Sequence, residues 1–223
     1  SVTEAGNPPT DRDNLKRRPL RVQIRSALLP IIRRETEVLE KIQPRVRHPV
    51  LAFYFAWSAT MASHTFYVLM LPLPLWFGAS VLSRDLVYVL GLGIFFTGNF
   101  KDYMCLPRPR SPPLHRITMS SYTTQEYGFP LSHSANATAV TLVLVLNIAR
   151  LSTIDPSTKL LLYGLSSIYY VLLILGRIYC GMHGFLDVFF GSAIGVSAFM
   201  FRFLLGKTWY DFLLVTNVST WLF

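Results

Sequence analysis

The sequence predicts an all-α fold, a polytopic bundle of transmembrane helices with an amphipathic interfacial helix in its N-terminal region. Hydrophobic residues make up 52% of the 223 residues and charged residues only 15%, whereas soluble domains carry about 25% charged residues. Several apolar stretches approach or exceed the about 20 residues that a helix needs to cross a bilayer. They lack the alternation of barrel strands, and only helices or closed barrels span lipid. An integral membrane protein is therefore expected.

The predicted spans define a membrane core over residues 50–205. They cover residues 50–77, 80–100, 132–151, 160–176 and 184–201. Residues 206–223 are expected to be the start of a sixth span that begins near Trp209 and is truncated at the end of the chain. In the fifth span, Gly191 and Gly195 are four residues apart, which predicts close packing between helices.

Residues 1–49 form a basic region ahead of the core. Residues 1–19 are polar and proline-rich and are expected to be disordered. Farther along, apolar residues recur at helical spacing while charged residues fall elsewhere on the helical wheel. The apolar positions are Leu28, Ile31, Ile32, Val38, Leu39 and Ile42. The pattern predicts an amphipathic helix on the membrane surface, ended by Pro44 and Pro49. A helix packed on the bundle is the alternative, and both stay open.

The net charge of +9 does not indicate a nucleic-acid partner. Residues 1–49 hold eleven Lys and Arg against six Asp and Glu, and the rest of the chain is mostly apolar. Membrane lipids are the partners that such a distribution suits. Cys105 and Cys180 are too few for a disulfide scaffold, and no Cys/His spacing indicates zinc. The oligomeric state has no signal in the sequence.

Three polar clusters stand at the ends of apolar stretches, where charges are costly and usually functional. They occupy residues 101–109, 128–134 and 177–187. No predicted crossing separates the first cluster from the second, and two separate the second from the third. All three are therefore expected on one side of the membrane.

Together the clusters offer the groups that phosphoryl transfer needs. Lys101, Arg108 and Arg177 are cations suited to a tetrahedral oxyanion. Asp187 follows His183 by four residues, so on a helix its carboxylate could hold one ring nitrogen and leave the other free to attack. His133 is the second imidazole. One histidine as nucleophile and the other as general acid would complete a two-step hydrolysis through a phosphohistidine.

No metal and no other cofactor is predicted. A metal-dependent phosphatase needs several clustered carboxylates. Between residues 99 and 190 the acidic residues are Asp102, Glu126, Asp155 and Asp187. The three cations of the clusters could take the role of the metal.

The spacing of these residues resembles the type 2 phosphatidic acid phosphatase superfamily, the lipid phosphate phosphatases. The pattern is Lys-x6-Arg-Pro from Lys101, Pro-x-x-His ending at His133, and Arg-x5-His-x3-Asp from Arg177. The surrounding residues 126–138 and 176–183 are most similar to sphingoid long-chain base 1-phosphate phosphatases. The resemblance implies that His183 is the nucleophile, with Asp187 as its partner, and that His133 protonates the leaving alcohol. It also implies that the three cations bind phosphate and that no metal takes part.

Two positions depart from the family pattern. Leu131 stands where a phosphate-binding serine is expected, and Gly176 replaces a serine at the start of the third motif. Ser132 is the remaining candidate hydroxyl for the phosphate, although neighbouring side chains on a helix point about 100° apart. The loss of a hydroxyl at position 131 is expected to lower activity.

The predicted function is a metal-independent phosphomonoesterase that hydrolyses a sphingoid long-chain base 1-phosphate. A non-catalytic protein that binds or transports lipid phosphates and a phosphatidic acid phosphatase are the alternatives. The resemblance implies the endoplasmic reticulum, with the pocket facing its lumen. However, an even number of predicted spans precedes Lys101, which puts the pocket beside the basic N-terminal region, and the positive-inside rule makes that side cytoplasmic. The side of the pocket stays open.

Overall fold

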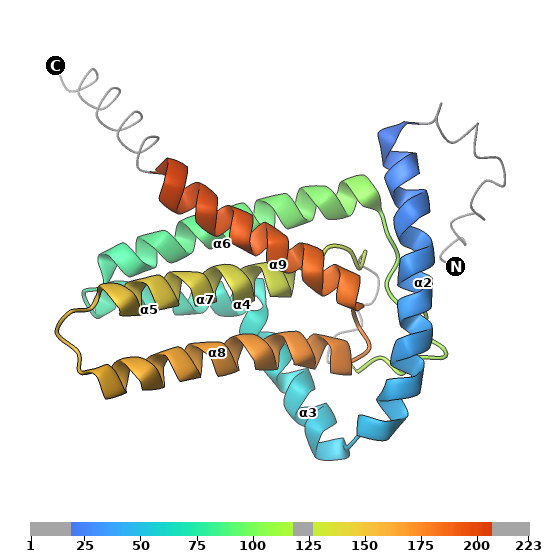
Figure 1. Cartoon of the computed structure of the whole chain (residues 1–223), viewed down its shortest axis with the longest axis horizontal. Helices are drawn as coiled ribbons and strands as arrows, with labels where there is room; N and C mark the ends of the chain where they lie inside the picture. Colours follow the sequence, from blue (N-terminus) through green and yellow to red (C-terminus); the bar gives the residue numbers. More distant parts are fainter. Residues whose placement is uncertain (1–18, 118–126, 207–223) are drawn as a thin grey trace.

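The computed structural model describes residues 19–117 and 127–206, and within these ranges every regular element is a helix (Figure 1). The helices are α2 (Leu20–Val46), α3 (Pro49–Ser58), η1 (Ala59–Ala62), α4 (His64–Met70), α5 (Pro72–Trp76), α6 (Ser80–Met104), α7 (Ser132–Arg150), α8 (Pro156–Tyr179), α9 (Phe185–Met200) and η3 (Phe201–Leu205), a π-helical turn. The all-α prediction is confirmed. The predicted span near Trp209 lies outside the described residues.

Four helices of the described chain are long and apolar enough to cross a membrane. They are α6, α7, α8, and α9 continued through η3. α7 is the central helix, since it packs against α6, α8 and α9. Its inward positions are largely small residues, among them Ala135, Ala137 and Ala139, all fully buried. Small side chains let the four helices approach closely, as in other membrane bundles.

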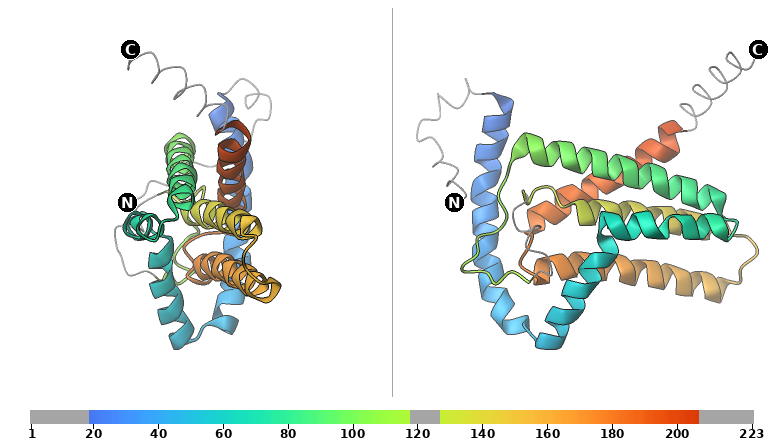
Figure 2. Two further views of the ribbon diagram at one scale, coloured as in Figure 1. Left: turned by 90° about the vertical axis from the view of Figure 1, so that its left-hand side faces the viewer. Right: turned by 180° about the vertical axis from the view of Figure 1, so that it is seen from behind.

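Over residues 50–77 the sequence predicts a helix that only Pro72 and Pro74 break, near its end; this is wrong, because the helix is already interrupted after Ser58. Ser58, Thr60 and Ser63 each donate a side-chain hydrogen bond to the carbonyl three residues earlier. Such bonds from hydroxyl side chains compete with the backbone hydrogen bonds of a helix. Ser63 then takes an extended conformation and caps α4 by accepting from the Phe66 amide. The segment still carries the chain from one end of the bundle to the other, as the α3–α5 path in Figure 2 shows.

The N-terminal helix α2 is continuous from Leu20 to Val46, with Pro30 and Pro44 inside it, so Pro44 does not end it as predicted. α2 runs across one end of the bundle, roughly perpendicular to the spans (Figures 1 and 2). Leu29 and Ile32 are buried in a cluster with Met104, Leu106 and Phe129. The helix is therefore packed on the bundle, the alternative that the sequence left open.

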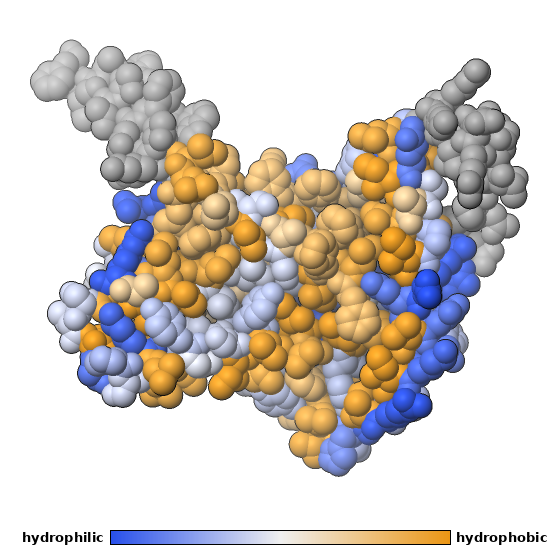
Figure 3. Space-filling view, viewed as in Figure 1, coloured by the Kyte–Doolittle hydropathy of each residue, from blue (hydrophilic) through white to orange (hydrophobic). Residues whose placement is uncertain are grey.

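The outer side of α2 keeps an amphipathic surface. Ile31, Val38, Ile42 and Val46 remain exposed, and Figure 3 shows apolar residues beside strongly polar ones along this helix. Exposed apolar and basic residues on one helix suit the headgroup layer of a membrane. The packing on the bundle and an interfacial position are thus compatible.

An ion pair joins the start of α6 to η3, which continues α9. The Arg202 guanidinium donates from both Nε and Nη2 to Asp85 Oδ1, at 3.1 and 2.7 Å. Asp85 is buried, and Arg202 also lies 4.9 Å above the Tyr88 ring. This contact fixes η3 against α6 at the end of the bundle away from α2.

Glycines allow α9 to touch α7, as the spacing of Gly191 and Gly195 predicts. A Cβ at Gly195 would overlap the carbonyl oxygen of Ala135, and one at Gly191 would overlap that of Leu131. These positions accept only hydrogen because the clashing atoms are backbone and cannot rotate away.

Gly195→Leu is therefore expected to destabilise the protein by about 1–3 kcal/mol, the usual cost of overpacking. Thermal unfolding in detergent measures the change. Gly164→Ala in α8 is the matched control, since a Cβ there meets no atom within 4 Å. Equal melting temperatures for the Gly195 variant and the wild type would contradict this account of the α7–α9 contact.

Candidate active site

The three polar clusters converge at the end of the bundle that α2 crosses. Lys101 lies in the last turn of α6, Ser132 and His133 in the first turn of α7, and Arg177 in the last turn of α8. His183 lies in the turn before α9, and Asp187 in the first turn of α9. Because these helix ends meet at one end of the bundle, the placement deduced from counting spans is confirmed.

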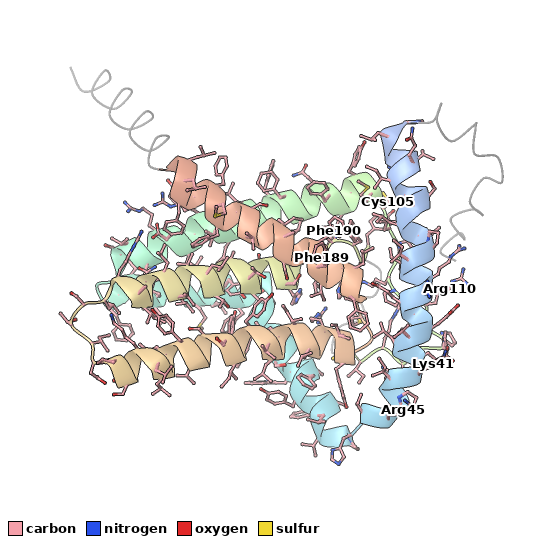
Figure 4. All side chains as sticks on the ribbon, in the orientation of Figure 1. Lys41, Arg45, Cys105, Arg110, Phe189 and Phe190 are labelled. Carbon is pink, nitrogen blue, oxygen red and sulfur yellow. The ribbon has the colours of Figure 1, made fainter. Side chains whose placement is uncertain are left out.

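The loop after α6 runs along α2 and brings in Arg108. In Figure 4, Cys105 at the end of α6 and Arg110 farther along the loop both lie beside α2. The Arg108 side chain is 7% exposed. A Cβ at Gly128 would come within 3.0 Å of the Arg108 Cα, so the second cluster packs directly on this arginine.

Arg108 contacts the imidazole of His183. Its Nη1 lies 2.7 Å from His183 Nε2 and also donates to the Met182 carbonyl at 3.2 Å. A guanidinium only donates hydrogen bonds, so Nε2 accepts and the ring proton resides on Nδ1. The lone pair of Nε2 therefore points at the Arg108 guanidinium.

Asp187 holds the other ring nitrogen. His183 Nδ1 lies 3.3 Å from Asp187 Oδ2, and both side chains are 1% exposed. The same oxygen accepts from the Gly184 amide at 3.1 Å. The pairing that the sequence predicts is confirmed, although its cause differs. His183 precedes α9, so the two side chains meet through the capping turn of that helix rather than along a helical face.

The surroundings keep His183 neutral. Burial, followed by the charges of Arg108, Arg177 and Lys101 and by His133, holds the pKa of His183 well below its usual 6.5. Lys101, Arg108, Arg177 and His133 therefore all lie near this one imidazole. A neutral imidazole keeps the ring-nitrogen lone pair that a nucleophile needs, whereas an imidazolium does not.

The remaining predicted residues complete the wall of the site. Lys101 Nζ donates to Ser132 Oγ at 3.4 Å, which joins the first cluster to the second. His133 is half-buried and Arg177 is buried. All seven predicted site residues thus lie at one end of the bundle, and electrostatics or hydrogen bonds connect them.

The two departures from the family pattern have different structural settings. Leu131 is fully buried, and its amide donates to the Asp187 carbonyl at 3.1 Å. A Cβ at Gly176 would lie 2.8 Å from the Phe55 ring, so a serine there would crowd α3. The expected effect of Leu131 on activity stays an untested prediction.

Two residues of α2, which the sequence analysis did not indicate, reach the region of the site. Glu35 Oε1 accepts from the Leu186 amide at 2.8 Å. Gln43 makes two hydrogen bonds with the His115 backbone, at 2.7 and 2.9 Å. The available signal was the position of Glu35 three residues after Ile32 and four before Leu39, which puts a carboxylate on the apolar, buried face of the helix.

Metal donors do not gather at this site. Within the described ranges, no three His, Cys, Asp or Glu side chains come together as a metal ion requires. Cys180 is buried and Cys105 is half-buried, and neither is in a disulfide. Metal-independent chemistry stays a prediction.

The fold and motifs have known counterparts. The family model described as the PAP2 superfamily matches residues 82–211. The chain is 46% identical over 201 residues to the dihydrosphingosine 1-phosphate phosphatase YSR3 of Saccharomyces cerevisiae, covering 90% of this chain and 50% of that protein. It is 33% identical over 144 residues to human sphingosine-1-phosphate phosphatase 2, covering 64% and 34%. The chain spans about half the length or less of these curated relatives.

Solved structures share the fold. The crystal structure of a transmembrane PAP2-type phosphatidylglycerolphosphate phosphatase from Bacillus subtilis aligns with a TM-score of 0.65 and 20% identity, over 88% of this chain and 96% of that one. Aquifex aeolicus LpxE aligns with a TM-score of 0.58 and 23% identity, over 74% and 91%. Identities this low support the bundle architecture alone.

The low pKa of His183 predicts how stability depends on pH. The unfolded chain binds a proton at this residue near pH 6.5, whereas the folded protein binds it only at lower pH. The stability linked to His183 is therefore complete above about pH 6.5 and falls as the pH drops toward the folded value. Between pH 7.5 and 5.5, the melting temperature of His183→Gln should therefore decrease less than that of the wild type.

The matched control is His115→Gln, which removes an exposed histidine and should follow the wild-type profile. Identical pH profiles for His183→Gln and the wild type would contradict a buried, neutral His183.

Proposed function

The chain belongs to the PAP2 superfamily, and from this premise we propose that it is a metal-independent phosphomonoesterase of the membrane that acts on sphingoid long-chain base 1-phosphates. The observation that carries the proposal is the buried Arg108–His183–Asp187 series, with Lys101, Arg177 and His133 around it. Arginine and lysine side chains gathered around one point suit a phosphate dianion, because its oxygens accept charge-assisted hydrogen bonds from several of them at once. The neutral imidazole of His183 lies beside these cations.

Substrate binding would free the nucleophile. In the structure an Arg108 N–H donates to His183 Nε2. Phosphate oxygens are stronger acceptors for a guanidinium than an imidazole nitrogen, and they accept two parallel N–H groups. The arriving phosphate would therefore draw Arg108 away and expose the Nε2 lone pair. Arg108 would thus change from a partner of His183 to a ligand of the phosphate.

In the first step, His183 Nε2 attacks phosphorus and the bond to the ester oxygen breaks. His133, in its protonated form, gives its proton to the leaving alkoxide, and a phosphohistidine remains. Asp187 stabilises the positive charge on the ring through Nδ1–H. Lys101, Arg108 and Arg177 neutralise the charge that develops on the phosphoryl oxygens.

In the second step, a water molecule attacks the phosphohistidine. His133 is now the base and takes one proton from the water. The P–N bond breaks, inorganic phosphate leaves, and His183 returns to its neutral form with its proton on Nδ1. Both steps use the same groups in opposite proton states.

A lipid substrate suits the surroundings of the site. An apolar cavity of about 260 Å³ lies between α2, α3 and α8, next to the turn of α8 that carries Arg177. Its walls include Leu39, Ile42, Phe55, Leu114, Leu175 and Ile178. The relatives named for dihydrosphingosine and sphingosine phosphates support a single-chain substrate. A location in the endoplasmic reticulum rests on resemblance alone.

Phosphate release from dihydrosphingosine 1-phosphate in detergent micelles tests the proposal. The wild type should turn over at the same rate with and without EDTA, because arginine and lysine replace a metal. His183→Ala should lower turnover by about a thousandfold or more, as the loss of a nucleophile does. His115→Ala is the control and should retain wild-type turnover.

Substrate binding without phosphate release by the wild type would favour a binding or transport protein. Inhibition by EDTA that magnesium reverses would contradict the metal-free chemistry. Full turnover by His183→Ala would remove this residue from the nucleophile's role.

A comparison of chain number tests the substrate class. Matched phosphomonoesters with one and two alkyl chains should differ in kcat/KM, and the one-chain sphingoid phosphate should be preferred. The expected preference follows from the relatives named for dihydrosphingosine and sphingosine phosphates. Equal or greater kcat/KM on phosphatidic acid would identify a general lipid phosphatase instead.

A further inference from the structure

Glu35 belongs to none of the three clusters, yet its carboxylate sits on the turn that carries His183 and Asp187. Oε1 accepts the Leu186 amide at 2.8 Å. Oε2 is out of contact with solvent and has no hydrogen-bond partner within the described part of the chain. It lies so close to Gly184 that any Cβ there would overlap it. Position 184 therefore requires glycine for as long as Glu35 occupies this place.

The packing of α2 forces this carboxylate inward. Ile32, Thr36 and Leu39 on the same face of the helix are buried. Burial raises the pKa of Glu35, while the Leu186 and Phe185 amides act in the opposite direction. The hydrogen bond from the Leu186 amide offsets part of the cost of taking this carboxylate out of water.

The first turn of α9 divides its free amides between two carboxylates. Gly184 N–H donates to Asp187 Oδ2, and Leu186 N–H donates to Glu35 Oε1. The first amides of a helix have no partners within the helix, so a nearby carboxylate is drawn to them. Without Glu35, Asp187 would be the nearest acidic group to the vacated amides. Turning toward them would take its carboxylate away from His183.

We propose that Glu35 is a positioning residue of the reaction, which occupies the Leu186 amide so that Asp187 stays on His183 Nδ1. This inference rests on the proposed function, because it concerns the nucleophile. It also gives α2 a role in chemistry, since the helix delivers one acceptor to the catalytic turn. The other charged groups that face Asp187 are Arg108, from the loop after α6, and Lys101 from α6.

Two substitutions separate the acceptor from the charge. Glu35→Ala removes the acceptor and should lower kcat about ten- to a hundredfold with KM within twofold, because misplacement rather than lost substrate contact causes the defect. Glu35→Gln keeps an amide oxygen for Leu186 and should recover most of kcat. Glu35→Gln also removes a negative charge, which makes the imidazolium form of His183 less favourable. The acidic limb of the pH profile of kcat/KM should therefore move to lower pH. Glu40→Ala, at an exposed position of the same helix, is the control.

A readout without substrate keeps this test separate from that of the proposed function. Orthovanadate mimics the five-coordinate phosphoryl group. Its binding, followed by thermal shift, needs no turnover and depends on the placement of His183 beside the three cations. Glu35→Ala should bind it about tenfold more weakly than the wild type and Glu40→Ala. Equal vanadate binding, an unchanged kcat in Glu35→Ala, or an unchanged pH limb in Glu35→Gln would overturn the inference while leaving the proposed function intact.

If the wild type binds vanadate but releases phosphate from no sphingoid substrate, the proposed function fails and the vanadate comparison still decides the role of Glu35. A wild type that neither binds vanadate nor releases phosphate overturns both.

Discussion

Three cations gathered at one end of an apolar bundle, two of them buried, are the constraint on which the structure depends. Arg108 and Arg177 are each less than a tenth exposed, and Lys101 joins them from α6. Like charges in such a place repel one another and lose hydration. Burial, followed by the charges of these cations, lowers the pKa of His183. The proposed function assigns a phosphate dianion to this group of cations.

The bundle holds these cations and the two histidines in place through the ends of its helices. α7 brings Ser132 and His133 by packing against the glycines of α9, and the Asp85–Arg202 pair fixes the far end of the first and last spans. At the near end, α2 contacts the start of α9 through Glu35 and the Leu186 amide. α9 thus receives restraints at both ends, and His183, in the turn before it, meets Asp187, in its first turn.

The sequence predicted most of the site because charged residues are rare in apolar helices and the count of spans fixed their side. It failed where the outcome depends on competition within the backbone. Apolarity over residues 50–77 could not reveal that three hydroxyl side chains and the extended Ser63 end the helix. The His183–Asp187 spacing predicted the pair that the structure shows, but on one helical face, whereas the two side chains meet through the capping turn before α9. Glu35 was missed because its partner, Leu186, lies on a distant element that only tertiary packing brings near.

Trapping the covalent intermediate tests the central claim most directly. The wild type, mixed with a radiolabelled sphingoid 1-phosphate and quenched under denaturing alkaline conditions, should carry label on the peptide that contains His183. The adduct should be acid-labile, as a phosphoramidate is, and it should be missing from His183→Ala. Label on another residue, or phosphate release with inversion at a chiral phosphorus and no adduct, would contradict the account.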